Sequence, residues 1–106
     1  MYLLHIAEAI SDIQGYVSTG KDDFFSKKMI QDAVIRNLEI IGEAVKNISP
    51  TTRLNTPEVP WQKIAGLRDV LIHHYFGVDL DSVWLVVERR LPLLSRYVSV
   101  LLEETY

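Results

Sequence analysis

The first half of the chain contains two stretches in which apolar residues return every three or four positions. In residues 1–18 they are Leu3, Ile6, Ala7, Ile10, Ile13 and Val17. In residues 24–48 they are Ile30, Val34, Leu38, Ile41, Val45 and Ile48. Such spacings place side chains on one face of an α-helix. They predict a helix over residues 1–18, closed by Gly20, and a longer one over residues 24–48, capped by Asp22 or Asp23.

A linker and a third helix are predicted next. The helix over residues 24–48 should end at Ser49-Pro50, because the residue before a proline avoids helical geometry. Residues 51–60 hold threonines and prolines, which indicates a linker. Proline is favoured at the first helical position, so Pro60-Trp61 predicts the start of a helix that runs to about Tyr75, with Gly77 as its stop.

The last helix is expected to start at Asp79, a candidate N-cap. Its apolar stripe comprises Val83, Val87, Leu91, Leu94, Val98 and Leu101. Pro92 lies inside this stripe, where it removes a backbone donor and clashes with the carbonyl of Glu88, so we expect a kink and not an end. No strand-like alternation occurs. We therefore expect one all-α domain over residues 1–106, an antiparallel four-helix bundle with a kink in the last helix.

Composition narrows the function classes. The chain has 106 residues and a net charge of −3, whereas a nucleic-acid binder usually carries a basic balance, so any contact with RNA should be local. It has no cysteine, which excludes disulfides and thiolate metal sites and favours the cytoplasm. No apolar run approaches the roughly 20 residues of a membrane-spanning helix, and the N-terminus lacks the basic region of a secretory signal.

The most unusual chemistry lies between Gly66 and Gly77, where an arginine, an acid, two histidines and a tyrosine occur close together. His73 can move protons near neutral pH, and Arg68 offers a fork of donors to a phosphate. Asp69, one helical turn before His73, can orient the imidazole. This set suits metal-independent cleavage of RNA, in which the 2′-hydroxyl of the substrate attacks its own phosphate.

Helix geometry separates Arg68 from His73. Five residues at about 100° each place the two about 140° apart. Either the long arginine reaches around the helix, or a second copy of the helix completes the site, which predicts a homodimer. Structural interpretations stay open: a surface ion pair of Arg68 and Asp69, a histidine favoured at a helix end, and a core role for Tyr75. No carboxylate pair accompanies His73, so we expect no metal or cofactor.

Other polar residues allow two interpretations each. His5 stands alone in an apolar stripe and is interpreted as structural. The basic pairs Lys27-Lys28 and Arg89-Arg90 form ordinary solvated faces or hold an RNA backbone. Four polar residues interrupt the second helix and form either a solvated face or the lining of a cleft. They are Arg36, Asn37, Glu39 and Glu43.

The run from Arg68 to Tyr75 resembles the Arg-x4-His-x-Tyr motif of the HepT-like toxins in the HEPN superfamily. Arg-x4-His alone is frequent by chance, but the tyrosine and the flanking segments add specificity. The segments that are similar to the family are residues 32–44, Pro60-Trp61, and Tyr75-Phe76-Gly77-Val78-Asp79 followed by Val83-Trp84. The resemblance covers residues 3–102.

This resemblance implies a HEPN-like bundle that acts as the toxin of a toxin–antitoxin pair and cleaves RNA, either mRNA or tRNA. It assigns catalysis to Arg68 and His73, with Asp69 as a supporting residue where the family commonly has asparagine. It also implies a homodimer with a shared cleft. The partner would be a minimal nucleotidyltransferase antitoxin that silences the toxin by adenylylating Tyr75. The alternative is a non-enzymatic HEPN helical dimer that binds nucleotide or a partner protein.

Overall fold

The computed structural model describes residues 2–62, 64–65 and 80–105, and these ranges contain helices and loops but no strand. The elements are α1 (Tyr2–Tyr16), α2 (Lys21–Ser26), α3 (Lys28–Lys46), α4 (Pro50–Asn55), α6 (Leu80–Leu85), the π-helical turn η1 (Val86–Arg90) and α7 (Leu91–Thr105). The all-α prediction is confirmed.

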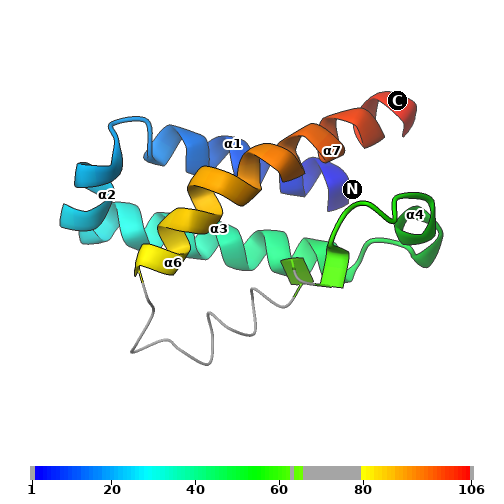
Figure 1. Cartoon of the computed structure of the whole chain (residues 1–106), viewed down its shortest axis with the longest axis horizontal. Helices are drawn as coiled ribbons and strands as arrows, with labels where there is room; N and C mark the ends of the chain where they lie inside the picture. The colour runs from blue at the N-terminus through cyan, green and yellow to red at the C-terminus, as the bar shows by residue number, and fades with distance from the viewer. Residues whose placement is uncertain (1, 63, 66–79, 106) are drawn as a thin grey trace.

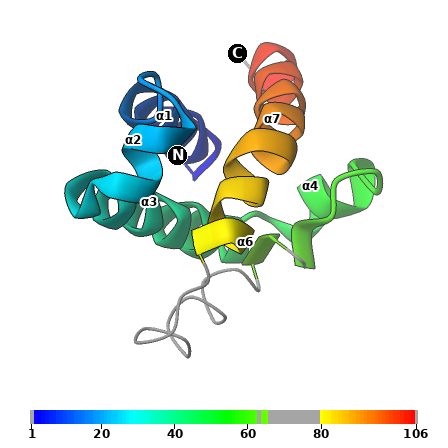
Figure 2. The ribbon, with the colours of Figure 1, turned by 60° about the vertical axis from the view of Figure 1, so that its left-hand side comes forward.

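Three long elements form the body of the molecule. α1 and α3 lie side by side and run in opposite directions (Figure 1). α6, η1 and α7 follow one another without a break, and we call them the C-terminal rod. This rod crosses the α1–α3 pair and packs against α1 through α7. Figure 2 shows the rod beside this pair, with α4 on the side of the rod opposite to α1.

The predicted apolar stripes supply most of the core, to which α1 adds Ala9, whereas the predicted members Leu3, Ala7 and Val17 are only partly buried. From α1 the buried members are Ile6, Ala9, Ile10 and Ile13; from α3 they are Val34, Leu38, Ile41, Ala44 and Val45; from the rod they are Val83, Val87, Leu91, Leu94, Val98 and Leu101. Each long element therefore buries one stripe in a single shared core, as expected for helices that cannot hide their apolar faces alone.

The single helix predicted over residues 24–48 is wrong. Lys27 has extended geometry, with φ −114° and ψ 108°, and separates α2 from α3. The Gln31 side-chain amide donates to the carbonyls of Phe24 and Phe25, at 3.0 and 3.1 Å, and so satisfies two groups that end α2. Asp22 and Asp23 lie in the first turn of α2, whose N-cap is Gly20 at φ 104°, a geometry that suits glycine.

The segment predicted to be a linker contains α4. Ser49 caps this helix by accepting a hydrogen bond from the backbone N–H of Thr52 at 3.2 Å, and Pro50 occupies its first turn. The sequence pattern predicts Ser49-Pro50 only as a stop for the preceding helix. The same dipeptide is also a start signal, because serine is a preferred N-cap and proline suits the first helical position.

The last helix continues past Pro92, as predicted, and its irregularity is the π-helical turn η1. The N–H of Leu91 donates to the carbonyl of Val86, five residues earlier. Pro92 has no N–H to offer to the preceding turn, and the widened turn lies immediately before it.

A buried tryptophan holds the start of the predicted third helix. Trp61 is 5% exposed, and its Nε1–H donates to Thr56 Oγ1 at 2.9 Å. The Thr56 hydroxyl in turn donates to the carbonyl of Thr52 in α4, at 2.7 Å. Trp61, Gln62, Ile64 and Ala65 are helical, so the predicted start at Pro60-Trp61 is confirmed.

The two tryptophans provide a matched test of this anchor. Trp61→Phe removes a buried hydrogen bond, and we expect it to lower the free energy of unfolding by about 1–3 kcal/mol. Trp84→Phe removes the same atoms, but its Nε1–H donates to the exposed Glu88, so we expect a loss below about 1 kcal/mol. Urea unfolding followed by circular dichroism measures both. Equal losses would contradict the anchoring role of Trp61.

Candidate functional site

The catalytic residues predicted from the sequence, Arg68 and His73, lie outside the described residues, as do Asp69 and Tyr75. The predicted helix end near Tyr75 and the cap at Asp79 also lie outside them. The structure describes the flanks of the motif, up to Ala65 on one side and from Leu80 on the other. The described part of the site consists of these flanks and of the helices they pack against.

The flank that follows the motif is held by aromatic rings. Val83 in α6 is buried, and the ring of Trp84 packs on Phe24 and Phe25 of α2, with ring centroids 5.2 and 6.3 Å apart. Phe24 is fully buried. Aromatic pairs at such separations add stability beyond their buried area. The break at Lys27 turns α2 so that its two phenylalanines meet α6.

The flank that precedes the motif is held by Trp61, as described above. Each flank is therefore held by a buried aromatic side chain. Trp61 holds the flank before the motif, and Phe24 of α2 holds the flank after it through Trp84. This arrangement ties the ends of the motif segment to one packed core, which is the usual way a rigid scaffold supports a functional segment.

The polar face of α3 borders a cavity of about 320 Å³ between α3 and the N-terminal end of α1. We call it the α1–α3 cavity. Its charged lining residues on α3 are Arg36, Glu39 and Glu43. Arg36 Nη1 lies 3.6 Å from Glu39 Oε2. Asn37 instead donates to the carbonyl of Ala33 at 2.9 Å. Three of the four polar residues thus line this cavity, and whether they also border the motif stays a prediction, because the motif lies outside the described residues.

His5 does not belong to the core, and its interpretation as a structural residue stays a prediction. It is exposed and lines the α1–α3 cavity beside Tyr2, with the two rings edge to face at 6.3 Å. The sequence pattern alone did not place Tyr2 or His5 in this cavity. The antiparallel pairing of α1 with α3 could have suggested it, because that pairing brings the first turns of α1 to the last turns of α3.

The two basic pairs differ in their partners. Lys27 pairs with Asp23 at 3.5 Å, Lys28 with Asp32 at 3.4 Å, and Arg89 contacts Glu88 at 4.0 Å. A hydrogen bond from the Thr19 side chain, and then the charge of Lys27, holds the pKa of Asp23 below its usual value. No residue in the described part of the chain forms an ion pair with Arg90.

No three His, Cys, Asp or Glu residues in the described ranges come together as ligands for a metal ion. None of the described helices combines the length and apolar character that a membrane crossing requires.

Comparison with known proteins gives a consistent result. The family model described as "Ribonuclease HepT-like" matches residues 6–101. A Methanocaldococcus jannaschii protein named "Gamma-glutamylcyclotransferase and putative RNase" is 46% identical over 105 residues, which cover 98% of this chain. The chain spans 47% of that protein. No solved structure matches the chain with comparable significance.

Two shorter relatives are matched over most of their own length. The "Probable ribonuclease HepT" of Thermococcus cleftensis is 48% identical over 95 residues, which cover 89% of this chain and 86% of that protein. A "Putative RNase" of Methanocaldococcus jannaschii is 39% identical over 100 residues, which cover 93% of this chain and 92% of that protein.

Proposed function

Because this chain belongs to the ribonuclease HepT-like family, we propose that it is an endoribonuclease that cleaves RNA without a metal ion through Arg68 and His73. The observation that carries the proposal is the family match over residues 6–101, which includes the whole Arg-x4-His-x-Tyr motif from Arg68 to Tyr75. The motif, the flanks and the match all point to the same family.

The proposed reaction uses a nucleophile that the substrate already carries. His73 takes the proton of the 2′-hydroxyl, and the freed oxygen attacks the adjacent phosphorus. The bond from phosphorus to the 5′-oxygen breaks, and that oxygen receives a proton in return. The products are a 2′,3′-cyclic phosphate and a 5′-hydroxyl. Arg68 stabilises the charge on the phosphate, and Asp69 orients the imidazole of His73.

A homodimer completes the proposed site. Because Arg68 and His73 point about 140° apart on a regular helix, a second copy of the motif helix can supply the missing partner. We place the two copies of this helix near the two-fold axis, around a shared cleft.

The proposed biological role is that of a toxin whose antitoxin is a minimal nucleotidyltransferase, acting in the cytoplasm. The antitoxin transfers AMP from ATP to Tyr75, two residues after His73. The added phosphate engages the Arg68 guanidinium that must otherwise meet the RNA phosphate, so inhibition is both steric and electrostatic.

The chemistry predicts a defined product and a defined variant effect. In the presence of a chelator, the purified protein should cleave RNA and leave 2′,3′-cyclic phosphate ends. His73→Ala should lower the cleavage rate about 10²–10⁴-fold, because it removes proton transfer. His74→Ala is the matched control and should retain activity. A requirement for magnesium, or full activity of His73→Ala, would rule out this mechanism.

The dimer proposal predicts the mass of the particle in solution. Light scattering at tens of micromolar should give twice the mass of one chain, which is 12.2 kDa. A mixture of Arg68→Ala and His73→Ala chains should regain part of the cleavage activity if each site draws one residue from each copy. A monomer at these concentrations would contradict the proposal.

The control of Tyr75 predicts one site of modification. Incubation with the proposed partner, a minimal nucleotidyltransferase, and ATP should add one AMP, which mass spectrometry should map to Tyr75. Tyr75→Phe should escape modification and inhibition. Tyr16→Phe, which changes a tyrosine that is 44% exposed on α1, should not. An adduct on another residue, or inhibition of the Tyr75→Phe enzyme, would contradict the proposal.

A further inference from the structure

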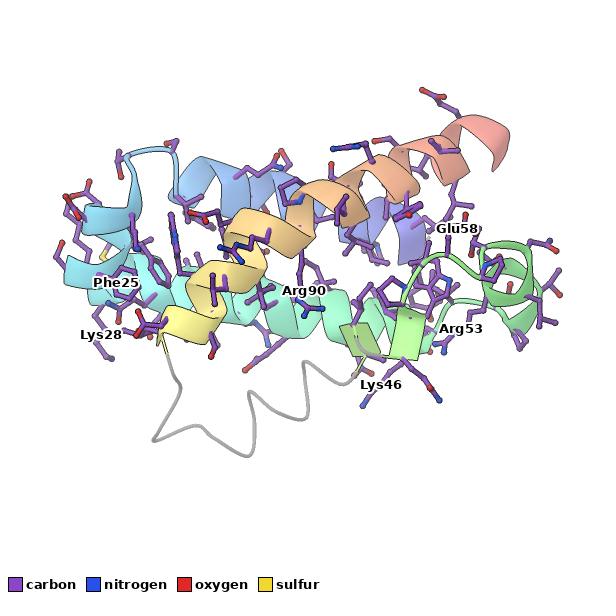
Figure 3. The ribbon with its side chains drawn as sticks, viewed as in Figure 1. Phe25, Lys28, Lys46, Arg53, Glu58 and Arg90 are labelled. Carbon is purple, nitrogen blue, oxygen red and sulfur yellow. The ribbon has the colours of Figure 1, made fainter. Side chains whose placement is uncertain are left out.

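A second cavity, also of about 320 Å³, lies between α3, residues 58–64 and the C-terminal rod. We call it the Arg90 groove. Its apolar lining includes Ile41, Val59, Ile64, Leu91, Leu94 and Tyr97. Its two charged residues are Arg90 of η1 and Glu58, both exposed. Figure 3 labels both and shows them at different ends of this region of the molecule. An apolar lining with few polar groups is typical of sites for small organic molecules.

Arg90 is available to an anionic ligand. Three of the four residues in the two basic pairs contact carboxylates, whereas no described residue pairs with Arg90. Glu58 lines the same groove, yet no ion pair joins it to Arg90. A guanidinium without a carboxylate partner can bind a phosphate through two parallel hydrogen bonds.

The backbone at Arg90 is also unusual. Arg90 is the last residue of the π-helical turn η1, and the next residue, Leu91, donates to the carbonyl of Val86. Turns of this kind are rare and occur frequently at functional sites. The first and last residues of this turn, Val86 and Arg90, both line the groove, and so does Leu91, which follows the turn. The irregular turn and the cavity thus coincide at the one arginine of the basic pairs that has no described partner.

The chemistry of the groove fits a nucleotide. Apolar walls with one aromatic side chain accept the flat face of a base, and bases in single-stranded RNA stack readily on such side chains. A volume near 320 Å³ is at the low end for ligand sites, so it suits one nucleotide and not a longer stretch. Glu58 can accept a hydrogen bond from an exocyclic amino group of a base. The α1–α3 cavity fits less well, because Arg36 there already faces Glu39.

We propose that the Arg90 groove binds one nucleotide of the RNA substrate, with the base against the apolar lining and its phosphate on Arg90. This proposal rests on the proposed ribonuclease function. Ile64 of the groove precedes Arg68 by four residues, so the groove adjoins the motif in the chain. Arg90 is then a substrate-binding residue outside the Arg-x4-His-x-Tyr motif, and it holds the RNA in register for cleavage.

The test measures binding apart from cleavage. In a His73→Ala background, which should not cut RNA, the dissociation constant of a labelled single-stranded RNA is measured at several salt concentrations. Arg90→Gln should weaken binding about tenfold and reduce the slope of log Kd against log salt by about 0.7, the value for one phosphate contact on a single strand. Arg96→Gln is the matched control, because Arg96 is exposed on α7 and does not line the groove.

A cross-link tests where the base lies. RNA that carries one 5-bromouridine should, on irradiation, attach to the peptide that contains Tyr97, and a mononucleotide in excess should reduce this attachment only weakly. Unchanged affinity and salt slope in Arg90→Gln, or cross-links confined to α1 and α3, would overturn the proposal. The proposal would also be wrong if the protein bound free mononucleotides tightly while its affinity for RNA did not depend on Arg90.

Failure of the groove proposal can be told apart from failure of the ribonuclease proposal. If the wild-type protein cuts RNA while Arg90→Gln binds RNA normally, the groove proposal is wrong and the ribonuclease proposal stands. If RNA binding depends on Arg90 while the wild-type protein never cuts, the groove stands and the ribonuclease proposal is wrong.

Discussion

The rest of the structure depends on the apolar stripe of α3, which packs against α1 and shares one core cluster with the buried residues of the C-terminal rod. Val34, Leu38, Ile41 and Val45 are at most 1% exposed. Full burial of such a side chain contributes about 1.5–3 kcal/mol relative to its exposed state. Because this stripe is shared, the opposite face of α3 is left for polar residues. Ile41 shows the connection, because it belongs to the core and also lines the Arg90 groove.

Periodicity was sufficient to predict the long helices, because each buries one stripe and the stripe appears in the sequence at spacings of three and four. It could not predict the break at Lys27. That break depends on the Gln31 amide, which bonds to the last carbonyls of α2, and such a contact changes no apolar spacing. Periodicity does not predict α4 for a related reason. Ser49-Pro50 both ends one helix and starts another, and the start signal changes no apolar spacing.

For the candidate site, the motif residues could be predicted from the sequence, whereas the cavities could not. The motif chemistry is local in the sequence, so Arg68, Asp69 and His73 could be proposed from residue type and spacing, and Tyr75 from the resemblance to the family. Cavities depend on which helices pack together, and the sequence pattern does not show this. His5 illustrates the difference, because it stands in an apolar stripe of the sequence, yet it is exposed and lines the α1–α3 cavity with Arg36 and Glu39. Arg90 illustrates it again, because its neighbours come from three separate parts of the chain.

In the proposed mechanism the RNA supplies its own nucleophile, the 2′-hydroxyl, and a change in the substrate alone tests this. A single cleaved bond is first mapped in a short RNA, and the 2′-hydroxyl of the nucleotide on its 5′ side is then replaced by hydrogen. Cleavage at that bond should disappear, while bonds elsewhere in the same strand are cut as before. Undiminished cleavage at the modified position would show that water or another group attacks the phosphorus, and would contradict the roles given to His73 and Arg68.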